Sequence, residues 1–157
     1  MTISSTLNEF LDRQNVEFEL VPHPHTGNSR DTALEAHVPG NRLAKAVVLK
    51  ADDIYSMVIV PSDEHVDLSL LREELGQRLE LATEPELSEL FPDCEIGAVP
   101  PIGPVWQLDT YLDDSFMAND QDVFFEAGDH EDLVRITGNQ FRKLQGKARH
   151  GHFGQTL

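Results

Sequence analysis

The stretch LAKAVVLKADDIYSMVIVP, residues 43–61, decides the fold class of this chain. Two nearly continuous apolar runs, residues 46–49 and 54–60, flank the turn signal Asp52-Asp53. Runs of this length are typical of central strands that are covered on both faces. The sequence therefore predicts two adjacent buried strands, with Lys45 at the entrance of the first.

Shorter patterns on both sides of this pair predict the rest of the fold. Residues 3–11 carry an amphipathic helix pattern, residues 16–20 alternate as a half-buried strand, and Thr137 is a candidate N-cap of a last helix. About six or seven strands and about four or five short helices in mixed order indicate an α+β single domain. We expect a mixed, mostly antiparallel sheet with flanking helices. The domain is expected to span residues 1–146, followed by a flexible basic, histidine-rich tail at 147–157.

The composition excludes several classes of protein. The 157 residues include 28 acidic and 12 basic side chains, a formal net charge of -16, which argues against a DNA partner held through phosphate neutralisation. The single cysteine cannot close an intramolecular disulfide, and no apolar run is long enough to cross a membrane. We therefore expect a cytoplasmic protein without a membrane partner.

The charge is unevenly distributed. Residues 133–157 contain five basic and no acidic side chains, and residues 30–50 also carry a net positive charge. The acidic residues are therefore concentrated in the rest of the chain. One interpretation is a solvated acidic surface that aids solubility. The other is that the two basic segments converge on a phosphate-bearing ligand.

Lys45 is the first candidate for a functional residue. A lysine in an apolar strand is costly unless its ammonium reaches a cleft or an anion. The alternative is a side chain that extends from the strand end to the surface.

The second candidate is the loop Gly97, Ala98, Val99, Pro100 and Pro101. Glycine lets another group approach the backbone and the prolines stiffen the turn, which suits backbone recognition of a small ligand. The alternative is a structural connection. His130 follows a strand and could reach the same cleft as a hydrogen-bonding group, or be a simple turn histidine.

The remaining reactive side chains predict no metal and no cofactor. His23, His25 and His37 lack the spacing of known metal-ligand motifs, and Cys94 is distant from them in the sequence. Cys94 is expected to pack as a small hydrophobic residue, and no serine has the context of a nucleophile.

Several of these motifs occur in the same order along the chain as in a known protein family. Residues 44–49 with Lys45, the Val60-Pro61 pair, Val66-Asp67-Leu68, the loop 97–103 and Ala127-Gly128 together resemble the YbaK family. This family is the free-standing relative of the editing domain inserted in bacterial prolyl-tRNA synthetases. The resemblance covers residues 3–146.

The resemblance implies a hydrolase that maintains translation fidelity, an aminoacyl-tRNA deacylase. Lys45 would hold the phosphate or acyl end of the substrate, and residues 97–101 would position the aminoacyl carbonyl and exclude substrates by size. His130 falls near a polar site position of some relatives. The implied partners are the acceptor end of a mischarged tRNA, either tRNA-Pro or a related tRNA carrying a small amino acid, and an aminoacyl-tRNA synthetase. The alternative is a non-catalytic module that binds a nucleotide or a tRNA end on the same fold.

Overall fold

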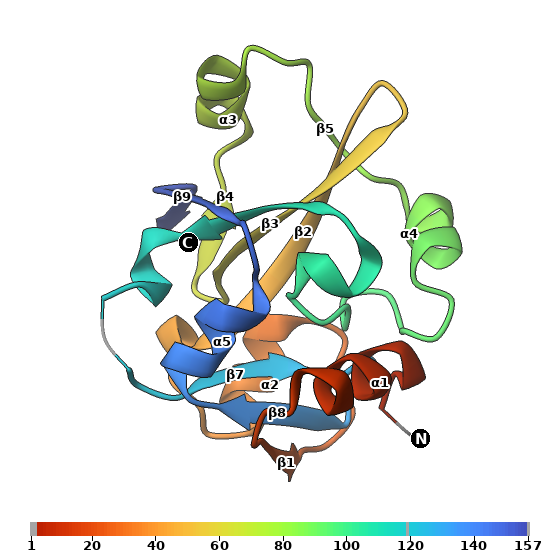
Figure 1. The fold of residues 1–157 in the computed structure, drawn as a ribbon, viewed down its shortest axis with the longest axis vertical. Helices are drawn as coiled ribbons and strands as arrows, with labels where there is room; N and C mark the ends of the chain where they lie inside the picture. Colours follow the sequence, from red (N-terminus) through yellow and green to blue (C-terminus); the bar gives the residue numbers. More distant parts are fainter. Residues whose placement is uncertain (1–2, 119, 157) are drawn as a thin grey trace.

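The apolar stretch at residues 43–61 forms the hairpin at the centre of the fold. The structure is a computed structural model that describes residues 3–118 and 120–156, so the expected domain and tail have their extreme ends outside the described residues. Strands β2 (Leu43–Ala51) and β3 (Ile54–Pro61) pair antiparallel along their whole length. The hairpin extends between α3 and α4 in Figure 1.

The other elements follow in mixed order along the chain. The helices are α1 (Ser5–Gln14), α2 (Ser29–Glu35), α3 (Leu68–Leu75), α4 (Glu84–Leu90) and α5 (Gly138–Leu144), with the 3-10 turns η1 (Gly40–Arg42), η2 (Gly103–Trp106) and η3 (Asp114–Phe116). The remaining strands are β1 (Glu19–Pro22), β4 (Glu64–Val66), β5 (Glu80–Leu81), β6 (Asp109–Asp113), β7 (Val123–Glu126), β8 (Asp132–Ile136), β9 (Arg149–Gly151) and β10 (Gly154–Thr156).

The main sheet has the order β1-β8-β7-β2-β3-β6-β9, with β5 added to β2, and β4 pairs separately with β10. Three pairings are parallel, β2 with β7, β3 with β6 and β6 with β9. The other five are antiparallel. The prediction of an α+β domain with a mixed, mostly antiparallel sheet and flanking helices is confirmed.

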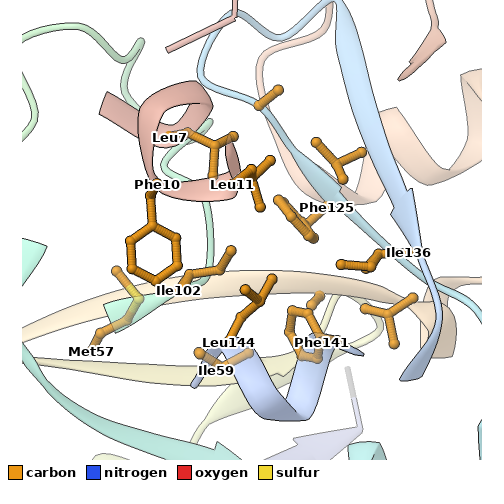
Figure 2. Packing of buried hydrophobic residues seen from close by; sticks show 14 of the residues in the cluster. Leu7, Phe10, Leu11, Met57, Ile59, Ile102, Phe125, Ile136, Phe141 and Leu144 are labelled. Carbon is orange, nitrogen blue, oxygen red and sulfur yellow. The ribbon is translucent and has the colours of Figure 1, made fainter. Parts of the chain in front are cut away.

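The larger core lies on one face of the sheet. Figure 2 shows Leu7 and Leu11 of α1 and Phe141 of α5 packed over Phe125 and Ile59 of the strands. Thr137 caps α5 as predicted, because its side chain accepts a hydrogen bond from the Gln140 amide. The opposite face carries two smaller apolar clusters, one under α2 and one under α3.

Two details differ from the sequence analysis. The first strand spans residues 19–22 rather than 16–20, and Pro22 is tolerated because β1 is an edge strand. The expected flexible tail instead contributes β9 to the sheet edge and β10 beside β4, and Phe153 between them is buried. Among residues 3–118 and 120–156, no helix has the length and apolar character needed to span a bilayer.

Candidate active site

Lys45 lies where the two smaller apolar clusters meet. Strand alternation places it on the same face as Leu43 and Val47. Leu43 belongs to the cluster under α2, and Val47 packs against the cluster under α3. Its cross-strand partner Val60 is fully buried. The lysine stem therefore crosses an apolar surface, and its charged end emerges between the clusters.

The Lys45 ammonium has no direct partner in the described part of the chain, where it forms neither an ion pair nor a side-chain hydrogen bond. Burial lowers the pKa of Lys45, while the charges of Asp63 and Glu64 act in the opposite direction. Asp63 also lines an open hollow of about 340 Å³ between α2, η1 and the turn after β3. Apolar side chains of Ala33 and Val38 form part of its wall. Arg30 and Asp63 add charge to this lining, and Lys45 is related to the hollow through the charge of Asp63 rather than as a lining residue.

The loop at 97–101 is divided between exposed and buried positions. Gly97 is exposed and Val99 half-exposed, whereas Ala98, Pro100 and Pro101 are buried. The buried part is anchored, because the Gln145 side chain donates a hydrogen bond of 2.8 Å to the Pro101 carbonyl. Only Gly97 and Val99, among the five predicted positions, are accessible to a ligand.

These two positions offer backbone donors. Within residues 3–118 and 120–156, the amides of Gly97 and Val99 donate no hydrogen bond, whereas the Ala98 amide between them donates to the Glu95 carbonyl. Gly97 has a φ of +86°, and a Cβ on it would meet His130 Nε2 at 3.2 Å. The missing side chain of Gly97 therefore faces protein atoms, so a role as a size filter would have to rest on its backbone.

His130 contacts this loop directly, and its ring has no free nitrogen. Nε2 lies 2.8 Å from the Ile96 carbonyl oxygen, and Nδ1 lies 2.6 Å from Oε2 of Glu126. The side chain is 3% exposed. Both ring nitrogens are held by acceptors of the protein in this structure, so His130 is placed to position the loop, and its expected catalytic role stays a prediction.

Glu126 was not singled out by the sequence, yet it connects two of the candidate histidines, His23 and His130. The parallel pairing of β2 with β7 ends at Ala44 and Phe125. The next residues along, Lys45 and Glu126, are therefore neighbours on the other face of the sheet. Among the described residues, no hydrogen bond or ion pair joins Lys45 to Glu126, to His130 or to the loop.

The remaining candidate residues have structural partners. His23 bonds Glu126, and His25 Nε2 lies 2.9 Å from Glu95 Oε2. Among the described residues, no group of three histidine, cysteine or acidic side chains could hold a metal ion. Burial raises the pKa of the Cys94 thiol to about 12, so it is not a thiolate nucleophile at neutral pH.

Arg42 and Arg142, one from each basic segment, lie close enough for their charges to interact, and both bind the backbone. Arg42 donates to the backbone carbonyls of Gln121 and Asp122, and Arg142 donates to the Phe116 carbonyl. The charge of Arg142 contributes to lowering the pKa of Arg42, after the larger effect of burial. The guanidinium groups of Arg42 and Arg142 therefore bind backbone carbonyls at this point.

Comparison with known proteins adds a family to this geometry. Residues 23–144 match the model of the aminoacyl-tRNA editing domain. A proline–tRNA ligase of Thermosipho melanesiensis is 31% identical over 96 residues, which is 60% of this chain and 17% of the ligase. The chain thus spans about a sixth of the length of that relative.

Solved structures share the fold. A crystal structure described as a candidate trans-editing enzyme for prolyl-tRNA synthetase has a TM-score of 0.82 and 23% identity, with 97% of this chain and 96% of that one covered. Part of a candidate signal transduction protein of Marinobacter aquaeolei, 31% of its chain, matches 98% of this chain with a TM-score of 0.75 and 17% identity. At these sequence identities, the structural similarity shows a shared fold alone.

Proposed function

The chain belongs to the aminoacyl-tRNA editing domain family, and on this premise we propose that it is a trans-editing deacylase of mischarged tRNA. Its substrate is tRNA-Pro, or a related tRNA, that carries a small amino acid. The match to a proline–tRNA ligase and the fold of a candidate trans-editing enzyme support this choice. The unpaired, half-buried Lys45 ammonium is the observation that carries the proposal.

Lys45 supplies positive charge where the reaction develops negative charge. Hydrolysis of an aminoacyl ester passes through a tetrahedral oxyanion, and a fixed cation in a partly desolvated cleft stabilises it more than water does. No carboxylate within 4 Å neutralises this ammonium in the described residues. The lysine is therefore available to the acyl or phosphate end of a bound substrate.

The exposed loop amides are suited to orient the ester. In the part of the chain that the structure describes, the Gly97 and Val99 amides have no hydrogen-bond acceptor, and such amides can bind a carbonyl oxygen and its developing charge. The ester is already activated, so positioning of water or of the neighbouring ribose hydroxyl suffices without a covalent nucleophile. The high pKa of Cys94, about 12, supports this mechanism.

The hollow lined by Asp63, whose charge acts on Lys45, is of a size for a small acyl side chain. Its volume of about 340 Å³ limits the size of the group, and its lining combines the apolar Ala33 and Val38 with the charged Arg30 and Asp63. With a net charge of -16, the protein binds the acceptor end alone and leaves most of the tRNA affinity to a synthetase partner in the cytoplasm.

The test is a panel of tRNAs charged with different amino acids, incubated with the protein while free amino acid is measured. Release from tRNA-Pro carrying a small amino acid, and none from correctly charged prolyl-tRNA, is the expected result. A folded protein that binds these tRNAs without releasing amino acid would be the non-catalytic binding module instead.

A further inference from the structure

A glutamate and two histidines form a buried cluster behind the loop. Glu126 Oε1 lies 3.0 Å from His23 Nε2, and Glu126 Oε2 lies 2.6 Å from His130 Nδ1. The side chains of His23, Glu126 and His130 are 0%, 4% and 3% exposed. Thr32 Oγ1 also donates to Glu126 Oε2 at 3.2 Å. Charged groups at this depth must be fully paired.

The two rings have similar hydrogen-bond partners, and those of His130 determine its protonation. The outer nitrogens face backbone carbonyl oxygens, His23 Nδ1 that of Pro24 at 2.7 Å and His130 Nε2 that of Ile96 at 2.8 Å. The inner nitrogens face the two oxygens of one carboxylate. A carbonyl and an ionised carboxylate can only accept, so both nitrogens of the His130 ring have to donate. A neutral imidazole has one N–H and cannot meet this requirement.

We propose that Glu126 is a positioning residue that holds His130 as an imidazolium cation, and that His130 in this state fixes the Ile96 carbonyl and thereby the ligand-binding amides of the loop. The effect on catalysis rests on the proposed deacylase function. The protonation of the His130 ring and the fixing of the loop do not.

The cluster ties together segments that are distant in the sequence. His23 and Pro24 belong to the loop before α2, Ile96 and Gly97 to the candidate ligand loop, and His130 to the turn between β7 and β8. The Gly27 carbonyl also lies 3.3 Å from the position of a Gly97 Cβ. One buried carboxylate therefore determines the relative placement of three loops.

The surrounding charges are consistent with this state. Burial lowers the pKa of His130, but the hydrogen bonds to Glu126 and Ile96 and the charges of Glu126 and Glu95 outweigh it, so the pKa is raised. The ring of His25 lies edge-on to His130 at 5.7 Å between centroids.

On the side of His23, two further acids surround the cluster. Burial and the neighbouring Asp129 raise the pKa of Asp132 to about 6, and the charge of His23 acts against this shift. The Asp129 pKa is lowered, because hydrogen bonds from the Glu131 and Asp132 amides outweigh its burial. Asp129 and Asp132 therefore influence each other's ionisation next to His23.

Glu126→Gln is the decisive variant, because it keeps the shape but replaces one acceptor oxygen with an amide donor. NMR titration of ring nitrogen and carbon shifts in the full chain is expected to show His130 protonated above its ordinary pKa of about 6.5 in the wild type. In Glu126→Gln the His130 pKa falls, and the buried Ala98 amide, which donates to the Glu95 carbonyl, exchanges with solvent about tenfold faster or more. Asp113→Asn is the matched control, since Asp113 is equally buried but lies outside the cluster, and it leaves the His130 titration unchanged.

Other results would overturn the proposal. One is that wild-type His130 stays neutral at pH values near or below its ordinary pKa. The other is that Glu126→Gln leaves both the His130 pKa and the amide exchange rate of the loop unaltered. The wild-type shifts alone decide the protonation if Glu126→Gln does not fold. None of these readouts requires tRNA. A negative deacylation panel with a raised His130 pKa would therefore refute the proposed function and leave the cluster intact.

Discussion

Lys45→Met should separate activity from stability, because Lys45 is an unpaired charge on an apolar surface. Methionine retains the unbranched stem that packs near Val47 and Val60 and removes the ammonium. Loss of one group that stabilises an oxyanion typically costs about 2.7 to 4 kcal/mol. We therefore expect the deacylation rate constant to fall by about 100- to 1,000-fold.

The effect on folding should have the opposite sign. The folded-state pKa of Lys45 is lowered, with burial as the main cause. A lowered lysine pKa means that folding disfavours the charged form, so at neutral pH this charge reduces the free energy of unfolding. Lys45→Met removes that cost, and the thermal unfolding midpoint should stay unchanged or rise.

Lys50→Met is the matched control on the same strand. Lys50 points to the opposite face and pairs with Glu86 at 2.6 Å, and this hydrogen bond is the main cause that raises the pKa of Lys50. Its removal should lower the unfolding midpoint slightly and leave deacylation unchanged. Single-turnover deacylation and thermal unfolding of both variants are the measurements. A Lys45→Met protein that is less stable than the wild type yet turns over normally would refute the reasoning.

Further predictions concern the loop, the histidine and the cysteine. Gly97→Ala should lower the unfolding midpoint and slow every aminoacyl ester alike, because its φ of +86° and the contact with His130 strain any side chain; the tRNA panel and a melting curve test this. The His130 pKa is raised. Protonated His130 therefore adds to the free energy of unfolding below about pH 6.5, and this contribution is lost as the pH rises through the folded-state pKa of His130. Deacylation, corrected for spontaneous ester hydrolysis, should decline over that alkaline range in a pH–rate profile. Chelators should leave deacylation unchanged, and bound zinc in untagged protein together with loss of activity would contradict this. Cys94, with a pKa of about 12, should resist alkylation at neutral pH, as mass spectrometry would show, and Cys94→Ala should stay active.

The central hairpin and the fold class could be predicted because their signals are local. Unbroken apolar runs around Asp52-Asp53 indicate paired strands wherever they occur, and the pairing of β2 with β3 confirms this. Lys45 could be found for the same reason, since one charge in such a run is conspicuous. Its role in catalysis stays a prediction.

Glu126 could not be found from the sequence, because its significance is entirely long-range. At the end of an apolar strand, a glutamate is typical of a solvated strand end. It is buried here because β1 pairs with β8 and β8 with β7, which brings His23 to it across 103 positions. The prediction of a flexible tail was wrong for the same reason. The short strands β9 and β10 form because they pair with β6 and β4, which are distant in the sequence.

The release of free amino acid from tRNA-Pro charged with alanine, compared with correctly charged prolyl-tRNA-Pro, is the most direct test of the proposed deacylase. The wild type should release alanine well above the spontaneous rate and leave proline attached, while Lys45→Met should approach the spontaneous rate for both. Equal spontaneous rates for the wild type and Lys45→Met, across the whole panel and with folded protein, would contradict an editing hydrolase built around Lys45.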